Sequence, residues 1–255
     1  MNDDETMVGT ATWVQETSGW LTPAARRAML LPLFRGHLTN ASGSVRHLLR
    51  LHPGRNAYVP PGRLAPPDSV LTREARAHAV RTLPIPLLNH SYRTCQFGRA
   101  LGEIEGVEVD TELLFAASML HDVGLVNPPG TADFTLASSR LAREIAEQVG
   151  LSTAASEVMQ TAITLHHSPG VTMSAGPVAY LLSAGAAVDV IGLRSWQLPT
   201  ETLTDVVREH PRVRFKHEFT QALRQEAARV PQGRAKLLLR YGAFAAAIRF
   251  APFEE

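Results

Sequence analysis

Cysteine is almost missing from this sequence, and Cys95 is the only one, so no disulfide bond can form within the chain. Disulfide-stabilised proteins are typical of oxidising compartments, and a single cysteine therefore favours a reducing one. The chain starts with MNDDET, which lacks the basic start and apolar core of a secretory signal. We therefore expect a cytoplasmic protein.

Long apolar runs and an excess of one charge are also missing. The most apolar stretch, residues 178–193, is too short to span a membrane and contains Asp189. The formal net charge is only +1, and the basic residues are scattered rather than gathered in one stretch, as a nucleic-acid-binding protein would have them. We expect a small-molecule substrate, with no nucleic acid and no membrane as partner. A homo-oligomer is compatible with these observations.

Alternating patterns typical of strands are missing as well, whereas apolar residues recur at helical spacing from about residue 70 onward. The sequence predicts an all-α, single-domain helical bundle with an N-terminal helical extension. The extension covers residues 1–65, with one helix from Pro23 to about Leu33 and a proline-rich loop. The helical domain covers residues 66–255. Within it the expected helices cover residues 71–83, 89–102, 111–123, 135–149, 152–167, 177–192, 200–210, 217–229 and 234–250.

Two local signals set the start of the helix that carries His90. Pro84 and Pro86 are expected to end the preceding helix, because proline disrupts a helix interior. Asn89 is expected to cap the next helix, since asparagine is a favoured N-cap residue.

Four of the predicted helices carry histidine or aspartate on a face that should point into the core. His90 lies on an apolar stripe of its helix, and the pair His121-Asp122, then His166 and Asp189, repeat this placement on later helices. An unpaired buried carboxylate is costly, so it needs a cation or a strong set of donors. Two carboxylates and several histidines that all face inward most simply share a divalent metal.

Each of these residues also has a structural interpretation when it is taken alone. A lone inward histidine is more often a hydrogen-bonded core residue than a ligand, and Asp189 could pair with Arg93. His167 is equally a polar neighbour or a ligand. The combination favours metal binding by His90, His121, Asp122 and Asp189, and it leaves open whether His166 reaches the metal.

The order of His90, His121-Asp122 and Asp189 on helices resembles the HD superfamily of metal-dependent hydrolases. The stretches NHSYRTCQFG (89–98), LLFAASMLHDVGL (113–125), AITLHH (162–167) and AGAAVDVIGLR (184–194) are similar to its cyanamide hydratase-like branch. The resemblance covers about residues 70–225 and implies an HD-type helical domain. Family members with two metals usually carry a further histidine after the His-Asp pair, and residues 123–165 contain none. One divalent metal is therefore expected, zinc by resemblance, although the ligand types also suit iron(II) or manganese.

The same resemblance implies roles for the residues around the metal. Catalysis would use metal-activated water, with Asp122 as both ligand and proton acceptor. His166 would contact substrate or orient water. Arg93, one helical turn from His90, would either neutralise an anionic substrate or form an ion pair with a carboxylate of the metal site. Cys95 is expected to be a buried thiol without a chemical role.

Three functions are compatible with this metal site. The first is hydration of a small cyanamide-like or nitrile-like molecule. The second is phosphomonoester or phosphodiester hydrolysis on a nucleotide, and the third is non-catalytic ligand binding. Phosphate chemistry generally needs several cations around the transferred oxygens, and only Arg93, and more distantly Arg99 and Arg194, are near the ligands in the sequence. This scarcity favours an uncharged substrate.

Overall fold

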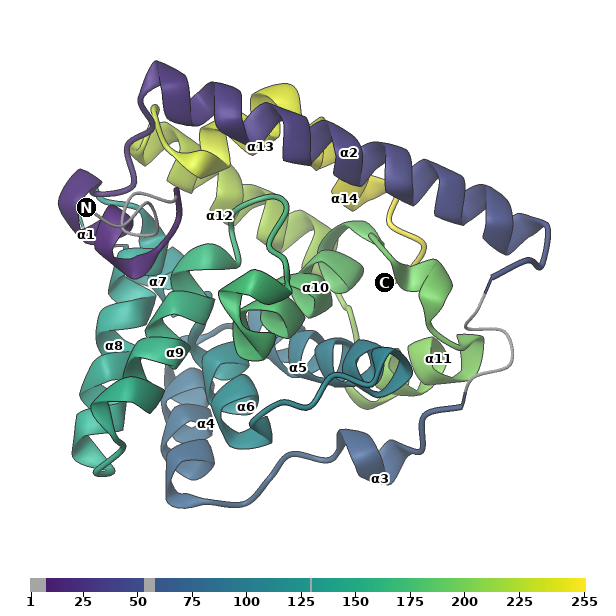
Figure 1. The fold of residues 1–255 in the computed structure, drawn as a ribbon, viewed down its shortest axis with the longest axis horizontal. Coiled ribbons are helices and arrows are strands. Elements are labelled where there is room, and N and C mark those ends of the chain that lie inside the picture. Colours follow the sequence, from purple (N-terminus) through teal and green to yellow (C-terminus); the bar gives the residue numbers. More distant parts are fainter. Residues whose placement is uncertain (1–7, 53–57, 129) are drawn as a thin grey trace.

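The computed structural model describes residues 8–52, 58–128 and 130–255, and these described residues form helices and connecting loops without a strand (Figure 1). The all-α fold class expected from the sequence is confirmed. None of the described helices combines the length and the apolar character needed to span a membrane.

Helices α5 (Ile85–Glu105) and α10 (Pro177–Ile191) form the centre of the fold and pack directly against each other. Glycines allow their backbones to approach closely: a Cβ on Gly98 would lie 2.5 Å from the carbonyl oxygen of Leu181, and one on Gly185 would clash with that of Thr94. The two contacts define an antiparallel register. One helical turn from the Thr94–Gly185 contact, the same register brings His90 next to Asp189.

Further helices enclose this central pair, and most begin at a side-chain cap. Ser69 caps α4 (Val70–Thr82), Asp110 caps α6 (Thr111–Leu120), Asp133 caps α8 (Phe134–Gln148) and Ser152 caps α9 (Thr153–Leu165). The short helix α7 (Val123–Val126) connects α6 to α8. The faces that these helices turn toward α5 and α10 are buried, and they form one continuous apolar core.

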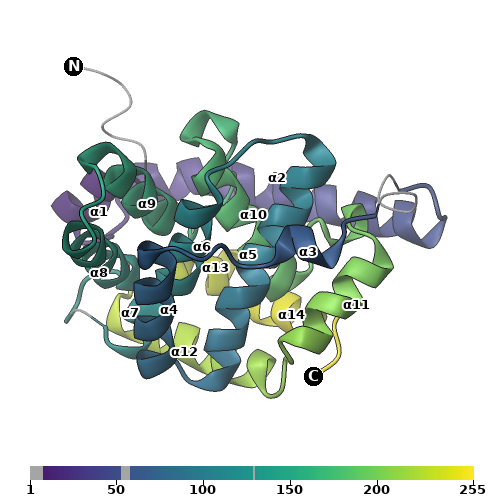
Figure 2. The same cartoon turned by 90° about the horizontal axis from the view of Figure 1, so that it is seen from below.

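The N-terminal and C-terminal helices complete the fold around the central pair (Figures 1 and 2). They are α1 (Ala11–Thr17), α2 (Pro23–Leu48) and α3 (Pro61–Leu64) at the start of the chain, and α11 (Thr200–Glu209), α12 (Phe215–Arg229), α13 (Arg234–Tyr241) and α14 (Phe244–Arg249) at its end. Two short 3₁₀ turns, η2 (Met173–Ala175) and η3 (Ser195–Gln197), flank α10. In Figure 1, α2 runs along the top of the molecule, above α12, α13 and α14.

The extension differs from the expectation of one helix ending near Leu33. It contains α1, α2 and α3, and α2 continues through Pro32 for four more turns. A proline inside a helix removes one backbone hydrogen bond, but tertiary contacts can compensate for it. Here Pro32 packs against Gly170. A Cβ added to Gly170 would lie only 2.7 Å from the Cβ of Pro32. The division of the chain at residue 65 stays a prediction.

Two other helix boundaries were predicted wrongly. Helix α5 begins at Ile85 rather than Asn89, with Pro84 as its N-cap and Pro86 in its first turn, where a missing N–H costs no hydrogen bond. Asn89 instead donates its side-chain N–H to the carbonyl oxygen of Pro211, at 2.9 Å. The expected last helix is divided into α13 and α14, because Ala243 adopts a left-handed conformation with φ of 46°.

Candidate metal centre

Four polar side chains meet in the core, where the ends of α6 and α9 approach α5. His90 lies on the second turn of α5, and His121 and Asp122 follow α6 directly. His166 is the C-cap of α9. All four side chains are almost completely buried.

The Nε2 atoms of the histidines and the carboxylate of Asp122 point toward one another. His90 Nε2 and His121 Nε2 are 3.2 Å apart, and Asp122 Oδ2 lies 3.5 Å and 3.4 Å from them, respectively. His166 Nε2 lies 3.4 Å from Asp122 Oδ1. His90, His121 and Asp122 thus form a cluster whose ligand atoms lie within 4.8 Å of one another.

Hydrogen bonds on the far side of the rings determine which nitrogens carry lone pairs. His121 Nδ1 donates to the carbonyl oxygen of Ser118 at 2.7 Å, and His166 Nδ1 donates to that of Ile163 at 2.6 Å. Their Nε2 atoms are therefore free to act as ligands, as in most metal-binding histidines. Asp122 Oδ2 is buried without a hydrogen-bond partner. Because a buried unpaired oxygen facing imidazole nitrogens is costly without a cation, these residues fit a divalent metal.

Burial and neighbouring charges together set the protonation states of the cluster. Burial, together with the neighbouring histidines, lowers the pKa of His121 to about 3, so this ring is neutral and available for coordination. Burial alone would raise the pKa of Asp122, but His121, His166 and His90 outweigh it and hold that pKa well below its ordinary value. The cluster therefore presents an ionised carboxylate and a neutral imidazole to a metal.

Asp189 lies on the opposite side of His90 and has cations of its own. Its Oδ2 is 2.7 Å from His90 Nδ1, and its two oxygens accept bonds from Arg93 Nε and Nη2 at 2.8 Å and 2.9 Å. Arg212 Nη1 donates to Asp189 Oδ1 as well. Both arginines stack on Phe215, with guanidinium carbons 5.0 Å and 4.6 Å from the ring centre. Asp189 is thus placed to hold the ring of His90, as outer carboxylates do in many metal sites.

The structure brings together some of the residues predicted for the metal site and separates others. His90, His121 and Asp122 form the cluster, and His166 reaches it. Arg93 is buried in the ion pair with Asp189, one of the two roles that the sequence allowed. The ligand role of Asp189 stays a prediction, since its oxygens face His90 Nδ1 and the two arginines. Arg212 was not anticipated, because it lies in a loop without periodicity.

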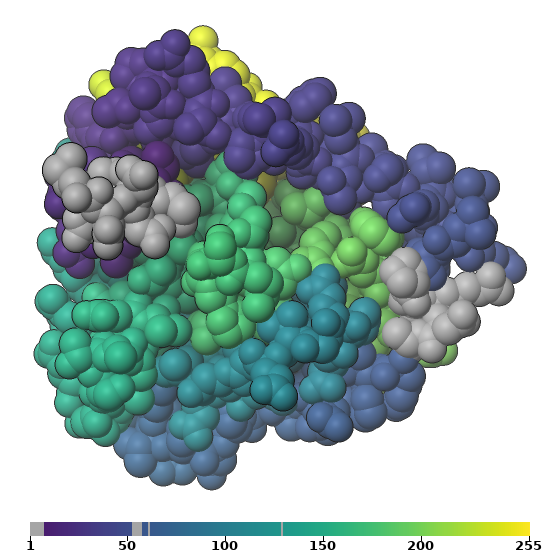
Figure 3. All heavy atoms as spheres, viewed as in Figure 1, coloured from purple at the N-terminus to yellow at the C-terminus, as the bar shows by residue number. Residues whose placement is uncertain are grey.

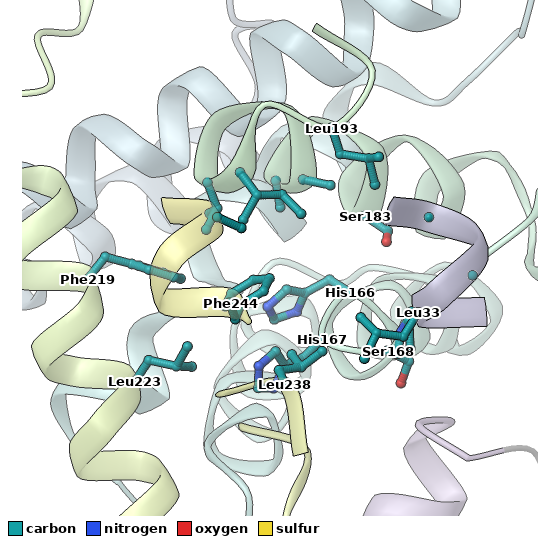
Figure 4. Close-up of a pocket in the computed structure, with 18 of the residues that line it drawn as sticks. Leu33, His166, His167, Ser168, Ser183, Leu193, Phe219, Leu223, Leu238 and Phe244 are labelled. Atoms are coloured by element: carbon teal, nitrogen blue, oxygen red, sulfur yellow. The ribbon is translucent and has the colours of Figure 1, made fainter. Parts of the chain in front are cut away.

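A pocket opens beside the histidines and is lined mostly by apolar side chains. In Figure 4, His166 and His167 lie in its middle, with Leu33, Leu238, Phe219, Leu223 and Phe244 around them. His167 is only 8% exposed, and neither of its ring nitrogens has a hydrogen-bond partner. Burial and the charge of Arg234 lower the pKa of His167 to about 3. The pocket therefore contains a neutral imidazole with unused hydrogen-bonding capacity.

The part of the chain that contains the cluster is similar to known proteins. The family model of the HD domain matches residues 87–211, which include every residue of the cluster. Residues 87–211 thus form an HD domain, as the resemblance in the sequence predicted. It is also 24% identical, over 199 residues, to the cyanamide hydratases DDI2 and DDI3 of Saccharomyces cerevisiae, covering 76% of this chain and 88% of each relative. The expected resemblance to the cyanamide hydratase-like branch of the HD superfamily is confirmed.

The match to the HD domain bears on what the cluster can bind. HD domains bind divalent metals, and His90, His121 and Asp122 can hold one. The HD domain and the similarity to cyanamide hydratases together indicate a metal-dependent enzyme.

Proposed function

We propose that this HD-superfamily enzyme adds water to a small, uncharged molecule with a carbon–nitrogen triple bond, with cyanamide as the reference substrate. The observation that supports this most strongly is the charge of the pocket. None of the described residues that line it is a lysine or an arginine, and its only charged side chain is Asp122. A phosphate dianion would therefore find few groups to neutralise it beyond the metal itself.

The arginines that could have served a phosphate are engaged elsewhere. Arg93 and Arg212 bind Asp189. Arg194 binds Glu105, and Arg99 donates to the carbonyl oxygen of Ala65. This arrangement argues against the nucleotide phosphohydrolase alternative, because none of the four guanidinium groups is free to point into the pocket.

Each residue of the cluster has a proposed role. One divalent metal, bound by His90, His121 and Asp122, would lower the pKa of water and so supply a nucleophile near neutral pH. We propose zinc, with iron(II) and manganese as alternatives. Asp122 would accept the proton of the attacking water, because its carboxylate is ionised and the residue lines the pocket. His166, hydrogen-bonded through Nδ1, would orient the water from Nε2.

The remaining polar residues would position the reactants. Asp189, predicted from the sequence as a fourth ligand, holds His90 in place through Nδ1 in the observed arrangement. His167 would hydrogen-bond the substrate, since it lines the pocket and its ring nitrogens have no partner within the protein. We also propose a cytoplasmic location, which the single cysteine supports.

A substrate panel with metal analysis tests this proposal. We expect about one divalent ion per chain and metal-dependent formation of urea from cyanamide, with weak or no release of phosphate from nucleoside monophosphates. Chelation should abolish turnover, and the same metal should restore it. Efficient nucleotide hydrolysis would show that the phosphohydrolase alternative is right. Two tightly bound ions would contradict the single-metal interpretation. Stable metal binding without turnover of either class would favour a ligand-binding domain.

A further inference from the structure

The pocket beside the metal cluster is larger than cyanamide requires. Its volume is about 160 Å³. A cavity of about 150 Å³ lined by Leu, Ile and Phe holds benzene in another protein, whereas one water molecule takes about 30 Å³ in the liquid. Cyanamide has only three non-hydrogen atoms. Most of the pocket would therefore remain unfilled by it, and another part of a substrate has room there.

The walls of the pocket select an apolar group. The side chains that form them come from the elements around the cluster, from α2 and from α12 to α14. Away from the cluster most of them are apolar, among them Leu33, Phe134, Phe219, Leu223, Leu238 and Phe244, and the polar ones, His37, Asn40, His167, Ser168 and Ser183, include no carboxylate, lysine or arginine. Burial of apolar surface is favourable, while a charged substituent would lose its hydration here without a partner.

One wall comes from outside the region that matches the HD domain. The residues of α2 that line the pocket are Pro32, Leu33, Gly36, His37 and Asn40, and their spacing places them on a single helical face. In the space-filling view of Figure 3, the surface is hollowed between α2, along the top, and the green surface beneath it. The extension thus contributes directly to the shape of the pocket.

Close contacts hold α2 in this position. Gly43 lies against the ring of Trp196 so closely that a Cβ could not be accommodated, and Pro32 lies against Gly170. Trp196 follows α10 in the chain, and Gly170 follows α9, so α2 is held at both ends of the pocket. The wall formed by α2 is therefore part of the folded site.

We infer that the substrate carries an uncharged apolar substituent about the size of a benzene ring or a short alkyl chain, and that α2 selects it. This inference rests on the proposed hydration. The triple bond would lie at Asp122 and the substituent between α2 and α12. For N-benzylcyanamide, one water adds across the triple bond. A carbon–oxygen bond forms, both protons of the water end on nitrogen, and N-benzylurea is the single product.

Gly36 provides a direct test, because a Cβ added there meets no atom within 4 Å. A Gly36→Leu variant should fill the pocket from α2 without disturbing the helix, in which leucine is favoured over glycine. Thr39→Leu adds the same side chain at an exposed position of α2 and serves as the matched control.

Two independent measurements test the inference: the kinetics of two cyanamides and the binding of two ureas. In the wild type, kcat/KM for N-benzylcyanamide should exceed that for cyanamide at least 10-fold, since even one methylene group in an apolar pocket is worth roughly 10-fold or more. Gly36→Leu should lower this ratio about 10-fold or more, and Thr39→Leu should preserve it. By calorimetry on chelated protein, N-benzylurea should bind at least roughly 10-fold tighter than urea, and Gly36→Leu should weaken its binding.

The outcomes separate this inference from the proposed function. Equal kcat/KM values for the two cyanamides, with equal binding of the two ureas, would overturn the inference and leave hydration intact. Tight, Gly36-sensitive binding of N-benzylurea without turnover of either cyanamide would support an apolar ligand and overturn hydration. A Gly36→Leu variant that binds N-benzylurea as the wild type does would overturn the role of α2.

Discussion

Asp122 and Asp189 are both buried beside His90, but they face opposite nitrogens of its ring and have different surroundings. Asp189 has two arginines within hydrogen-bonding distance, and every polar contact of its carboxylate is made inside the protein. Asp122 has only imidazoles around it, and its Oδ2 has no partner. The protein therefore supplies the cations for Asp189, whereas the cation that suits Asp122 must come from outside. Asp189 therefore stabilises the fold, whereas Asp122 is suited to binding a metal.

The largest effect that this comparison predicts is on stability, at Asp189. Asp189→Ala leaves Arg93 and Arg212 buried without a counter-charge, and breaking a buried pair in this way costs about 3–5 kcal/mol. The free energy of unfolding of the metal-free variant, measured by urea denaturation, should fall by that amount. Glu103→Ala removes the exposed partner of Arg63 and should cost less than about 1 kcal/mol. Equal effects of the two substitutions would contradict the structural role of Asp189.

The next effect is on metal binding, at Asp122. Asp122→Asn keeps the shape of the side chain but removes the charge that faces His90 and His121. Metal affinity should fall by more than about 100-fold, which is beyond the usual cost of losing an outer-shell partner. The metal content after purification measures this loss. In the presence of a chelator, urea denaturation of the variant should still be cooperative, so that the loss of metal is a loss of the ligand and not of the fold. Full metal retention would show that Asp122 is not a ligand.

The third effect is on the pH dependence of stability, in which the histidines and the carboxylates should act in different pH ranges. The pKa values of His121 and His167 are lowered to about 3 from 6.5, so the unfolded chain binds more protons below pH 6.5. Their contribution to stability is present above pH 6.5 and is lost as the pH falls toward 3. His90, whose pKa is raised, acts in the opposite direction and offsets part of this loss.

The carboxylates should change the stability of the fold only at lower pH. Burial alone would raise the pKa of Asp133, but Arg234 and its other partners outweigh it and lower that pKa to about 2 from 3.8. Its stabilising effect is therefore lost only below about pH 4. Denaturation of chelated protein from pH 7 to pH 3 should show a first decline that shrinks in a His167→Gln variant. An unchanged profile in that variant would contradict a neutral, buried His167.

The sequence was sufficient to predict the helices whose signals are local. Ser152 precedes a periodic apolar stretch, and it caps α9 as expected. Pro84 and Pro86 were read as stop signals, but in the first turn of a helix proline is favourable, and sequence alone did not separate the two cases. Pro32 lies inside α2, where the sequence alone predicts that a helix ends. It packs there against Gly170, which is far away along the chain.

Part of the candidate metal centre was also predictable from local signals. His90, His121 and Asp122 lie on inward faces of periodic helices, so helical spacing alone suggested that they meet. The pairing of Asp189 with Arg212 depends on where a loop of low periodicity returns to the core. The wall that α2 adds to the pocket depends on tertiary packing of a helix that carries no family motif. Neither the pairing of Asp189 with Arg212 nor the wall formed by α2 has a local signal in the sequence.

The burial of Cys95 has a practical consequence for measuring how this fold opens. It is the only thiol of the chain, it is 2% exposed on α5, and burial raises its pKa to about 12. Alkylating reagents react with the thiolate form of cysteine. In the native chain, burial keeps the reagent away from Cys95, and the raised pKa keeps its thiol protonated. Covalent labelling must therefore await an opening of α5, and its rate reports the free energy of that opening. The chain thus contains a single-site reporter of core dynamics at the helix that carries His90.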